Sequence, residues 1–175
     1  MSLRKKLLDT FLLPEPFGRW KATDALDADF ICPRAFGRNT YSDKAVGRVA
    51  IMRKCLETDI ETFETLKSER FDAGSPNTRL ALLCHNLATT LDKPIIGQWE
   101  VMHELYCSFP EWYKIHEKDL FTIWPPDEGY LATRGLLLKA EAIAKEYGWK
   151  TPIVVAHPEH IQRCFFLARE IFQAI

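Results

Sequence analysis

The sequence of 175 residues lacks the short glycine-containing motifs that identify many enzymes directly. It contains no G-x-S-x-G nucleophile elbow, no G-x-x-x-x-G-K-[ST] phosphate loop and no G-x-G-x-x-G dinucleotide motif. These absences argue against a conventional serine hydrolase, a P-loop nucleotidase and a conventional NAD-dependent dehydrogenase, because each depends on its motif to shape the backbone around the reacting group. Function must therefore be inferred from less specific patterns.

The low net charge, the short apolar runs and the spacing of the cysteines argue against further classes of protein and site. The net charge is −1, which gives no support to a nucleic-acid partner held by a basic surface. No apolar run approaches the roughly 20 residues of a transmembrane helix, and the short basic and apolar start at 1–13 is interpreted as a helix packed on the domain. The five cysteines are widely spaced without a C-x-x-C pair, so no metal centre is expected from them. Reduced, mostly buried thiols favour a cytoplasmic location.

What the sequence does contain is an alternation of short apolar runs with helical patterns. The predicted strands lie at 28–33, 94–98, 120–124 and 153–156. Strands that alternate with helices indicate a parallel sheet with helices on its faces. We therefore predict one Rossmann-like α/β domain over 28–175, preceded by an N-terminal helical extension over 1–27. It should be a three-layer sandwich whose mostly parallel sheet has at least four strands, with helices on both faces.

Several helix boundaries follow from capping residues. Ser75-Pro76 predicts a helix start with a hydroxyl cap and a proline at the first helical position. Asp127 or Glu128 is expected to start the helix after the third strand. Gly148 is expected to end that helix in a left-handed conformation.

The most informative segment is the apolar run at 152–156 and the polar residues that follow it, His157, Glu159, His160 and Arg163. This pattern is typical of a buried parallel strand that leads into a helix, and such folds bind ligands at the carboxyl ends of their strands. A neutral imidazole can accept or donate a proton near pH 7, so His160 is a candidate acid/base group. Alternatively, the two histidines and Glu159 hold a metal, or His157 or Glu159 caps the helix.

Arginines near the predicted strand ends point to an anionic ligand. Guanidinium groups bind phosphate or carboxylate through two hydrogen bonds, and a helix N-terminus adds to the attraction. The arginines expected to reach one crevice are Arg34, Arg38, Arg134 and Arg163. The alternative is that all four are solvated surface side chains.

Further binding candidates follow the second and third strands. Trp99 offers a stacking surface for a flat ring, although it could equally pack in the core. Glu100 is a candidate general base, and Gln98 a candidate ligand contact. Asp127 is a candidate ligand contact that could instead cap a helix, and Thr133 offers a hydroxyl to the pocket.

The fourth strand and its turn resemble the signature of the YdcF/SanA-like family of α/β proteins. Members carry an apolar strand followed by a His, two variable residues and an Arg, and His160 and Arg163 fall on these two positions. Other segments resemble the family's earlier landmarks in the same order, namely Asp29-Phe30-Ile31, 94–98, and 120–126 followed by Thr133. The resemblance covers about residues 28–175.

The sequence departs from that family where its members carry glycine or a Glu-Asn pair. The corresponding segments here are Cys32-Pro33-Arg34, Gly97-Gln98-Trp99 and Ala132-Thr133. Because glycine lets the backbone approach a ligand, these departures weigh against carrying over the family's ligand geometry. No common reaction is established for the family, so the resemblance implies a Rossmann-like pocket more than it implies a reaction. It also implies a link to cell-envelope integrity and, from one member, an S-adenosylmethionine-like ligand.

The expected function is therefore the binding of a small anionic or nucleotide-like ligand at the C-terminal edge of the sheet. Acid/base chemistry without a metal would use His160, with Glu100 or Asp127 as helper and Arg163 as the anion clamp. The alternative is a non-catalytic scaffold, for example in envelope maintenance, whose pocket has degenerated and whose aromatic segment 106–124 contacts a partner. The cofactor, the oligomeric state and the presence of any catalysed reaction stay open.

Overall fold

The computed structural model describes residues 26–36, 49, 53, 54, 56, 58–126 and 131–172. Almost all of the predicted N-terminal extension lies outside these residues. Two of the predicted ligand contacts, Arg38 and Asp127, also lie outside them.

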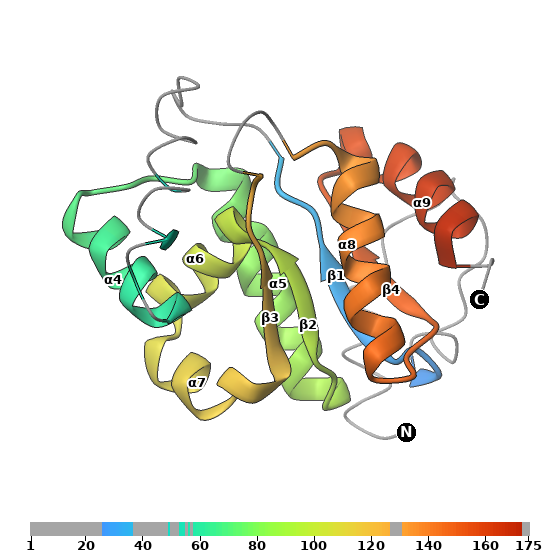
Figure 1. The fold of residues 1–175 in the computed structure, drawn as a ribbon, viewed down its shortest axis with the longest axis horizontal. Coiled ribbons are helices and arrows are strands. Elements are labelled where there is room, and N and C mark those ends of the chain that lie inside the picture. Colours follow the sequence, from blue (N-terminus) through green and yellow to red (C-terminus); the bar gives the residue numbers. More distant parts are fainter. Residues whose placement is uncertain are drawn as a thin grey trace.

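The four predicted strands are present and form one parallel sheet. They are β1 (Phe30–Pro33), β2 (Ile95–Gln98), β3 (Leu120–Ile123) and β4 (Pro152–Val155). Their spatial order is β3-β2-β1-β4 (Figure 1), with Cys32 opposite Val154 and Gly97 opposite Thr122. Every residue of β1 and β2 is buried, which explains why these strands are continuous apolar runs rather than alternating ones.

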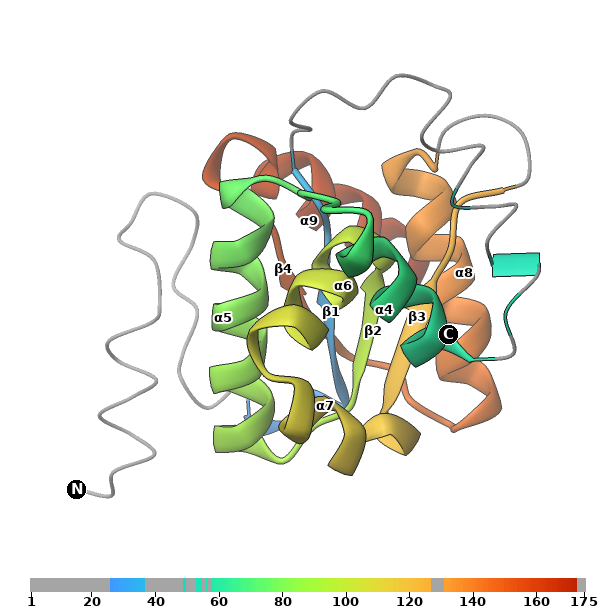
Figure 2. The ribbon, with the colours of Figure 1, turned by 90° about the vertical axis from the view of Figure 1, so that its left-hand side faces the viewer.

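Helices cover both faces of the sheet and complete the predicted three layers; Figure 2 looks onto one face. On that face lie α4 (Asp59–Ser68), α5 (Ser75–Leu91), α6 (Trp99–Ser108) and α7 (Pro110–Ile115), and on the other lie α8 (Thr133–Glu146) and α9 (Pro158–Phe172). Ile31 packs under the first group, whereas its neighbours Phe30 and Cys32 pack against the second. This is the alternation of side chains that a strand requires. A short 3-10 turn at Glu117–Asp119 leads into β3.

The start of α5 differs from the prediction. The helix begins at Ser75, and Gly74 before it is the cap, because its carbonyl accepts hydrogen bonds from the backbone N–H groups of Asn77 (2.9 Å) and Thr78 (3.3 Å). Gly74 has a φ of +89°, which glycine adopts readily. The predicted hydroxyl cap at Ser75 is therefore wrong, since the turn that precedes the helix falls on the glycine.

Helix α8 starts later than predicted. It begins at Thr133, and the two residues before it are not helical, so a start at Asp127 or Glu128 is wrong. The predicted end is confirmed, because Gly148 has a φ of +72° and its N–H donates to the carbonyl of Lys145. The late start places Thr133 in the first turn of the helix, beside the carboxyl ends of the strands.

The chain leaves the neighbouring strands β1 and β4 toward opposite faces of the sheet. After β1 it runs to α4 and α5, and after β4 it enters α9 on the other face. In open α/β sheets, ligands bind in the crevice where neighbouring strands diverge in this way. Pro33 and Val155, which are paired in the sheet, mark this position.

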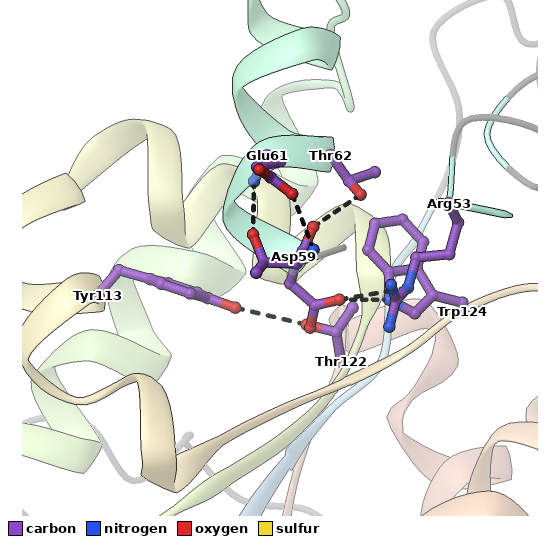
Figure 3. A network of polar contacts seen from close by, with 8 residues as sticks. Arg53, Asp59, Glu61, Thr62, Tyr113, Thr122 and Trp124 are labelled. Atoms are coloured by element: carbon purple, nitrogen blue, oxygen red, sulfur yellow. Dashed lines mark hydrogen bonds and ion pairs between the residues drawn. The ribbon is translucent and has the colours of Figure 1, made fainter. Parts of the chain in front are cut away.

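A polar network fastens α4 to the end of β3 (Figure 3). The indole N–H of Trp124 donates to Oδ1 of Asp59 at 2.9 Å, and Nε of Arg53 lies 3.4 Å from the same oxygen. Thr58 and Glu61 cap the start of α4 reciprocally. The network therefore fixes the helix against the sheet with side chains from three separate segments.

The aromatic segment 106–124 packs mainly in the core. Tyr106 and Tyr113 are 0% and 1% exposed. Phe109 and Trp112 are half-buried and pack against the same cluster. The segment therefore builds the layer that covers one face of the sheet, and it leaves little aromatic area for a partner.

Candidate functional site

Arg34 follows β1 directly, and it is buried. The residue is 3% exposed, and its Nη1 donates to Oε1 of Gln98 at 2.6 Å and to the carbonyl of Leu131 at 3.3 Å. Gln98, the last residue of β2, is also buried, and the same Oε1 accepts from the backbone N–H of Ala35 at 3.3 Å. Arg34 therefore joins the ends of two strands to the approach to α8, and it places a positive charge at the carboxyl edge of the sheet.

Thr133 and His160 meet at the same edge from two helices. Thr133 is the first residue of α8 and is 3% exposed, whereas His160 lies in the first turn of α9 and is half-buried. Oγ1 of Thr133 lies 3.2 Å from Nε2 of His160. The structure thus gathers four of the predicted site residues, which are Arg34, Gln98, Thr133 and His160.

His157 caps α9, and its ring packs on the loop that follows β1. Its carbonyl accepts from the N–H groups of His160 (2.8 Å) and Ile161 (3.0 Å), and its Nδ1 accepts from the N–H of Glu159 at 3.4 Å. Its ring stacks on Phe36 with the ring centroids 4.0 Å apart. The capping alternative is therefore confirmed for His157, and its contact with a ligand stays a prediction.

Burial and nearby positive charge both act on the pKa of His160. Burial, together with the guanidinium groups of Arg34 and Arg163, lowers the pKa of His160 below its ordinary value of 6.5. His160 is therefore mostly a neutral imidazole at pH 7. Burial raises the pKa of the Cys164 thiol to about 11, although the same two arginines oppose that rise.

The cysteines of the described residues behave as predicted. Cys32, Cys84 and Cys164 are buried, Cys107 is half-buried, and all four are free thiols. Burial raises the pKa of Cys32 to about 12. Because a thiol is a nucleophile only when deprotonated, the raised pKa of Cys32 disfavours nucleophilic chemistry at that residue.

Trp99 lies in the core rather than at the crevice. It is 3% exposed, and its ring lies 5.1 Å from that of Phe71 and 6.0 Å from that of Trp124. The predicted stacking surface for a ligand is corrected accordingly, because α6 turns this side chain into the cluster under α4. Glu100 is 4% exposed in the first turn of the same helix, and its role as a base stays a prediction.

Arg134 is engaged in an ion pair at the surface. Its Nη1 forms an exposed ion pair with Oε1 of Glu170 at 2.9 Å. Glu170 is near the end of α9, about 15 Å along the helix from His160 at 1.5 Å per residue. Arg134 therefore does not join the anion site, whereas Arg163 does lie near His160, whose pKa it lowers.

The two histidines of the turn have different partners. Nδ1 of His157 accepts from the first turn of its own helix, and Nε2 of His160 faces Thr133. Within the described residues no group of three or more His, Cys, Asp or Glu side chains is arranged to hold a metal ion. The metal alternative therefore finds no support among these residues, and the acid/base role of His160 stays a prediction.

Phe36 and Leu131 are contacts that sequence reasoning missed. The backbone N–H of Phe36 donates to Oδ1 of Asn77 at 2.9 Å, which holds the loop after β1 against α5. Leu131 contributes only a carbonyl oxygen, which any residue type could supply. A contact made by a backbone carbonyl cannot be predicted from the residue type. The contact of Phe36 could have been suspected only from its position two residues after Arg34.

Acidification should destabilise the protein through His160. Because the pKa of His160 is lower in the folded than in the unfolded state, the unfolded chain binds its proton first as the pH falls through 6.5. The free energy of unfolding should therefore fall as the pH drops below about 6.5, and more steeply than in His160→Gln. Urea unfolding at several pH values measures this. His116→Gln, on α7, is the control for losing one imidazole elsewhere; identical pH slopes for wild type and His160→Gln would contradict the prediction.

None of the helices in the described residues combines the length and apolar character that crossing a membrane requires. Comparison with known proteins found no matching family model, no matching curated protein and no matching solved structure. The α/β class therefore stands on the topology of this chain, and the resemblance to the YdcF/SanA-like family stays a prediction.

Proposed function

We propose that the protein binds a small anionic molecule, carrying phosphate or carboxylate, in the crevice between the ends of β1 and β4. The observation that carries this proposal is the buried Arg34 at the point where the two strands diverge. A guanidinium can present two parallel N–H groups to such an anion. Arg163 adds a second positive charge from α9, near enough to act on His160.

The surrounding backbone favours the same class of ligand. Helices α8 and α9 both begin at this edge, with Thr133 and His157 at their first turns. Helix N-termini carry partial positive charge and are common binding positions for phosphate. Nucleotides and sugar phosphates are therefore the first ligands to test, with S-adenosylmethionine added because of the family resemblance.

Arg163→Ala should abolish the stabilisation that a bound anion gives. A ligand present at about 100 times its Kd stabilises the folded state by about 2.7 kcal/mol, which raises Tm by several degrees. We expect inorganic phosphate or one of the ligands above to raise the Tm of the wild type but not that of Arg163→Ala. Differential scanning fluorimetry measures this. Arg134→Ala is the matched control, because that arginine pairs with Glu170 instead and its loss should leave the ligand shift intact.

Two results would contradict the proposal: no Tm shift of the wild type with any of these anions, or an equal shift in Arg163→Ala. The scaffold alternative has less support, because the aromatic segment that would contact a partner is mostly in the core, as Tyr106 and Tyr113 show. The cytoplasmic location predicted from the cysteines stays a prediction.

A further inference from the structure

Thr133 and His160 have the geometry of a nucleophile and its base. Their Oγ1 and Nε2 atoms are 3.2 Å apart, at the long end of the range in which a hydroxyl can pass its proton to an imidazole. The imidazole is mostly neutral at pH 7, since burial and the nearby positive charges lower its pKa, so a lone pair is free to accept that proton. The pair is built from two different helices, and neither residue is needed to cap its own helix through this contact.

The surroundings of the pair suit a phosphoryl group. Arg34 lies at the same edge, where it bonds the carbonyl of Leu131, two residues before Thr133. Arg163 lies one turn beyond His160 on α9. Positive charge near the pair stabilises the equatorial oxygens of a phosphoryl group in transfer, and transfer of this group is catalysed mainly by positioning and electrostatics.

We propose that Thr133 and His160 are the nucleophile and general base for phosphoryl transfer from a phosphate monoester, an inference that rests on the anion site proposed above. Oγ1 of Thr133 forms a bond to phosphorus while the bond from phosphorus to the ester oxygen breaks. The hydroxyl proton passes to Nε2 of His160 beside it, and the alkoxide, which departs on the opposite side of phosphorus, takes a proton from water, so an alcohol leaves. A second water then attacks phosphorus from the side that the alcohol has left, and its proton neutralises the hydroxide formed in the first step. The imidazolium of His160 returns its proton to Oγ1 of Thr133, which releases inorganic phosphate and restores the threonine.

The test uses para-nitrophenyl phosphate as the probe and two readouts on the full chain. One is the release of nitrophenolate, and the other is a phosphoryl group on the peptide that contains Thr133, found by mass spectrometry after an acid quench. Thr133→Val should lose both, and His160→Gln should slow release by about 100-fold or more. Thr133→Ser keeps the hydroxyl and should retain both, which separates loss of the nucleophile from loss of the fold. Thr65→Val, on α4, is the control that should release nitrophenolate at the wild-type rate.

A Tm measurement with inorganic phosphate distinguishes failure of the nucleophile assignment from failure of the proposed anion site. If the wild type binds phosphate but shows neither release nor labelling, the nucleophile assignment is overturned and the anion site stands. Release that persists in Thr133→Val overturns the assignment as well. If neither inorganic phosphate nor any of the nucleotides and sugar phosphates shifts the Tm of the wild type, both the anion site and the catalytic pair are refuted.

Discussion

Replacing Gly97 by alanine should destabilise the fold by about 1–3 kcal/mol, the usual cost of overfilling a packed core. An added Cβ would lie 2.5 Å from Sδ of Met102 and 2.9 Å from Cγ of Pro33. The methionine side chain can rotate away, but the ring of Pro33 is held by β1, which pairs with β2. The strain therefore falls on the junction of the two central strands, next to Gln98. Urea unfolding measures the change.

Gly135→Ala is the matched control for Gly97→Ala. Gly135 lies within α8, and a Cβ there would meet nothing closer than a methyl carbon of Leu131 at 3.7 Å. Alanine has a higher helix propensity than glycine, so this variant should be as stable as the wild type or up to about 1 kcal/mol more stable. If Gly97→Ala proved as stable as Gly135→Ala, the close packing of β2 against Pro33 would be refuted.

The sheet could be predicted because each strand is an apolar run bounded by polar or turn-forming residues. All four predicted strands agree with the structure to within about two residues, the usual uncertainty of such boundaries. The parallel arrangement followed from the helices between the strands, since parallel neighbours need a crossover. The strand order β3-β2-β1-β4 could not be predicted, because no sequence pattern indicates which edge of the sheet β4 joins.

Helix starts were predicted less well, and the physical reason is visible at α5. A hydroxyl before a proline is a strong statistical signal, but the turn into this helix needs a positive φ, which Gly74 supplies. The backbone requirement therefore prevails over the side-chain preference at Ser75. At α8 the sequence offered an acidic residue as a cap, but the structure begins the helix at Thr133, with Ala132 as the residue before it.

The candidate site could be predicted in part from one rule, that polar residues after parallel strands share an edge. The rule placed Arg34, Gln98 and His160 together, and the structure confirms that they are neighbours. It failed for Trp99 and Arg134, because it gives the position of a residue along the chain but not the direction of its side chain. The direction depends on how the helix packs against other elements, and the side chains of those elements determine that packing.

Replacing Arg34 by methionine should abolish the Tm shift with phosphate, raise the pKa of His160 and destabilise the fold by about 2 kcal/mol. Hydrogen bonds from a charged donor contribute about 1.5–3 kcal/mol each, and relief from burying the charge offsets part of the loss of the bonds to Gln98 and Leu131. The pKa of His160 should rise toward 6.5, since Arg34 is one of the charges that lower it. An NMR titration of the His160 ring protons measures this directly.

Arg34→Lys tests whether charge alone is sufficient. An ammonium keeps the positive charge but cannot offer the planar pair of donors, so the pKa of His160 should stay low while phosphate binding weakens. Both variants share the loss of the guanidinium bond to Gln98, so their difference isolates the electrostatic effect from the structural one. If Arg34→Met still binds phosphate and leaves the titration of His160 unchanged, the guanidinium has only a structural role in linking the strand ends. The anion must then bind elsewhere on the protein.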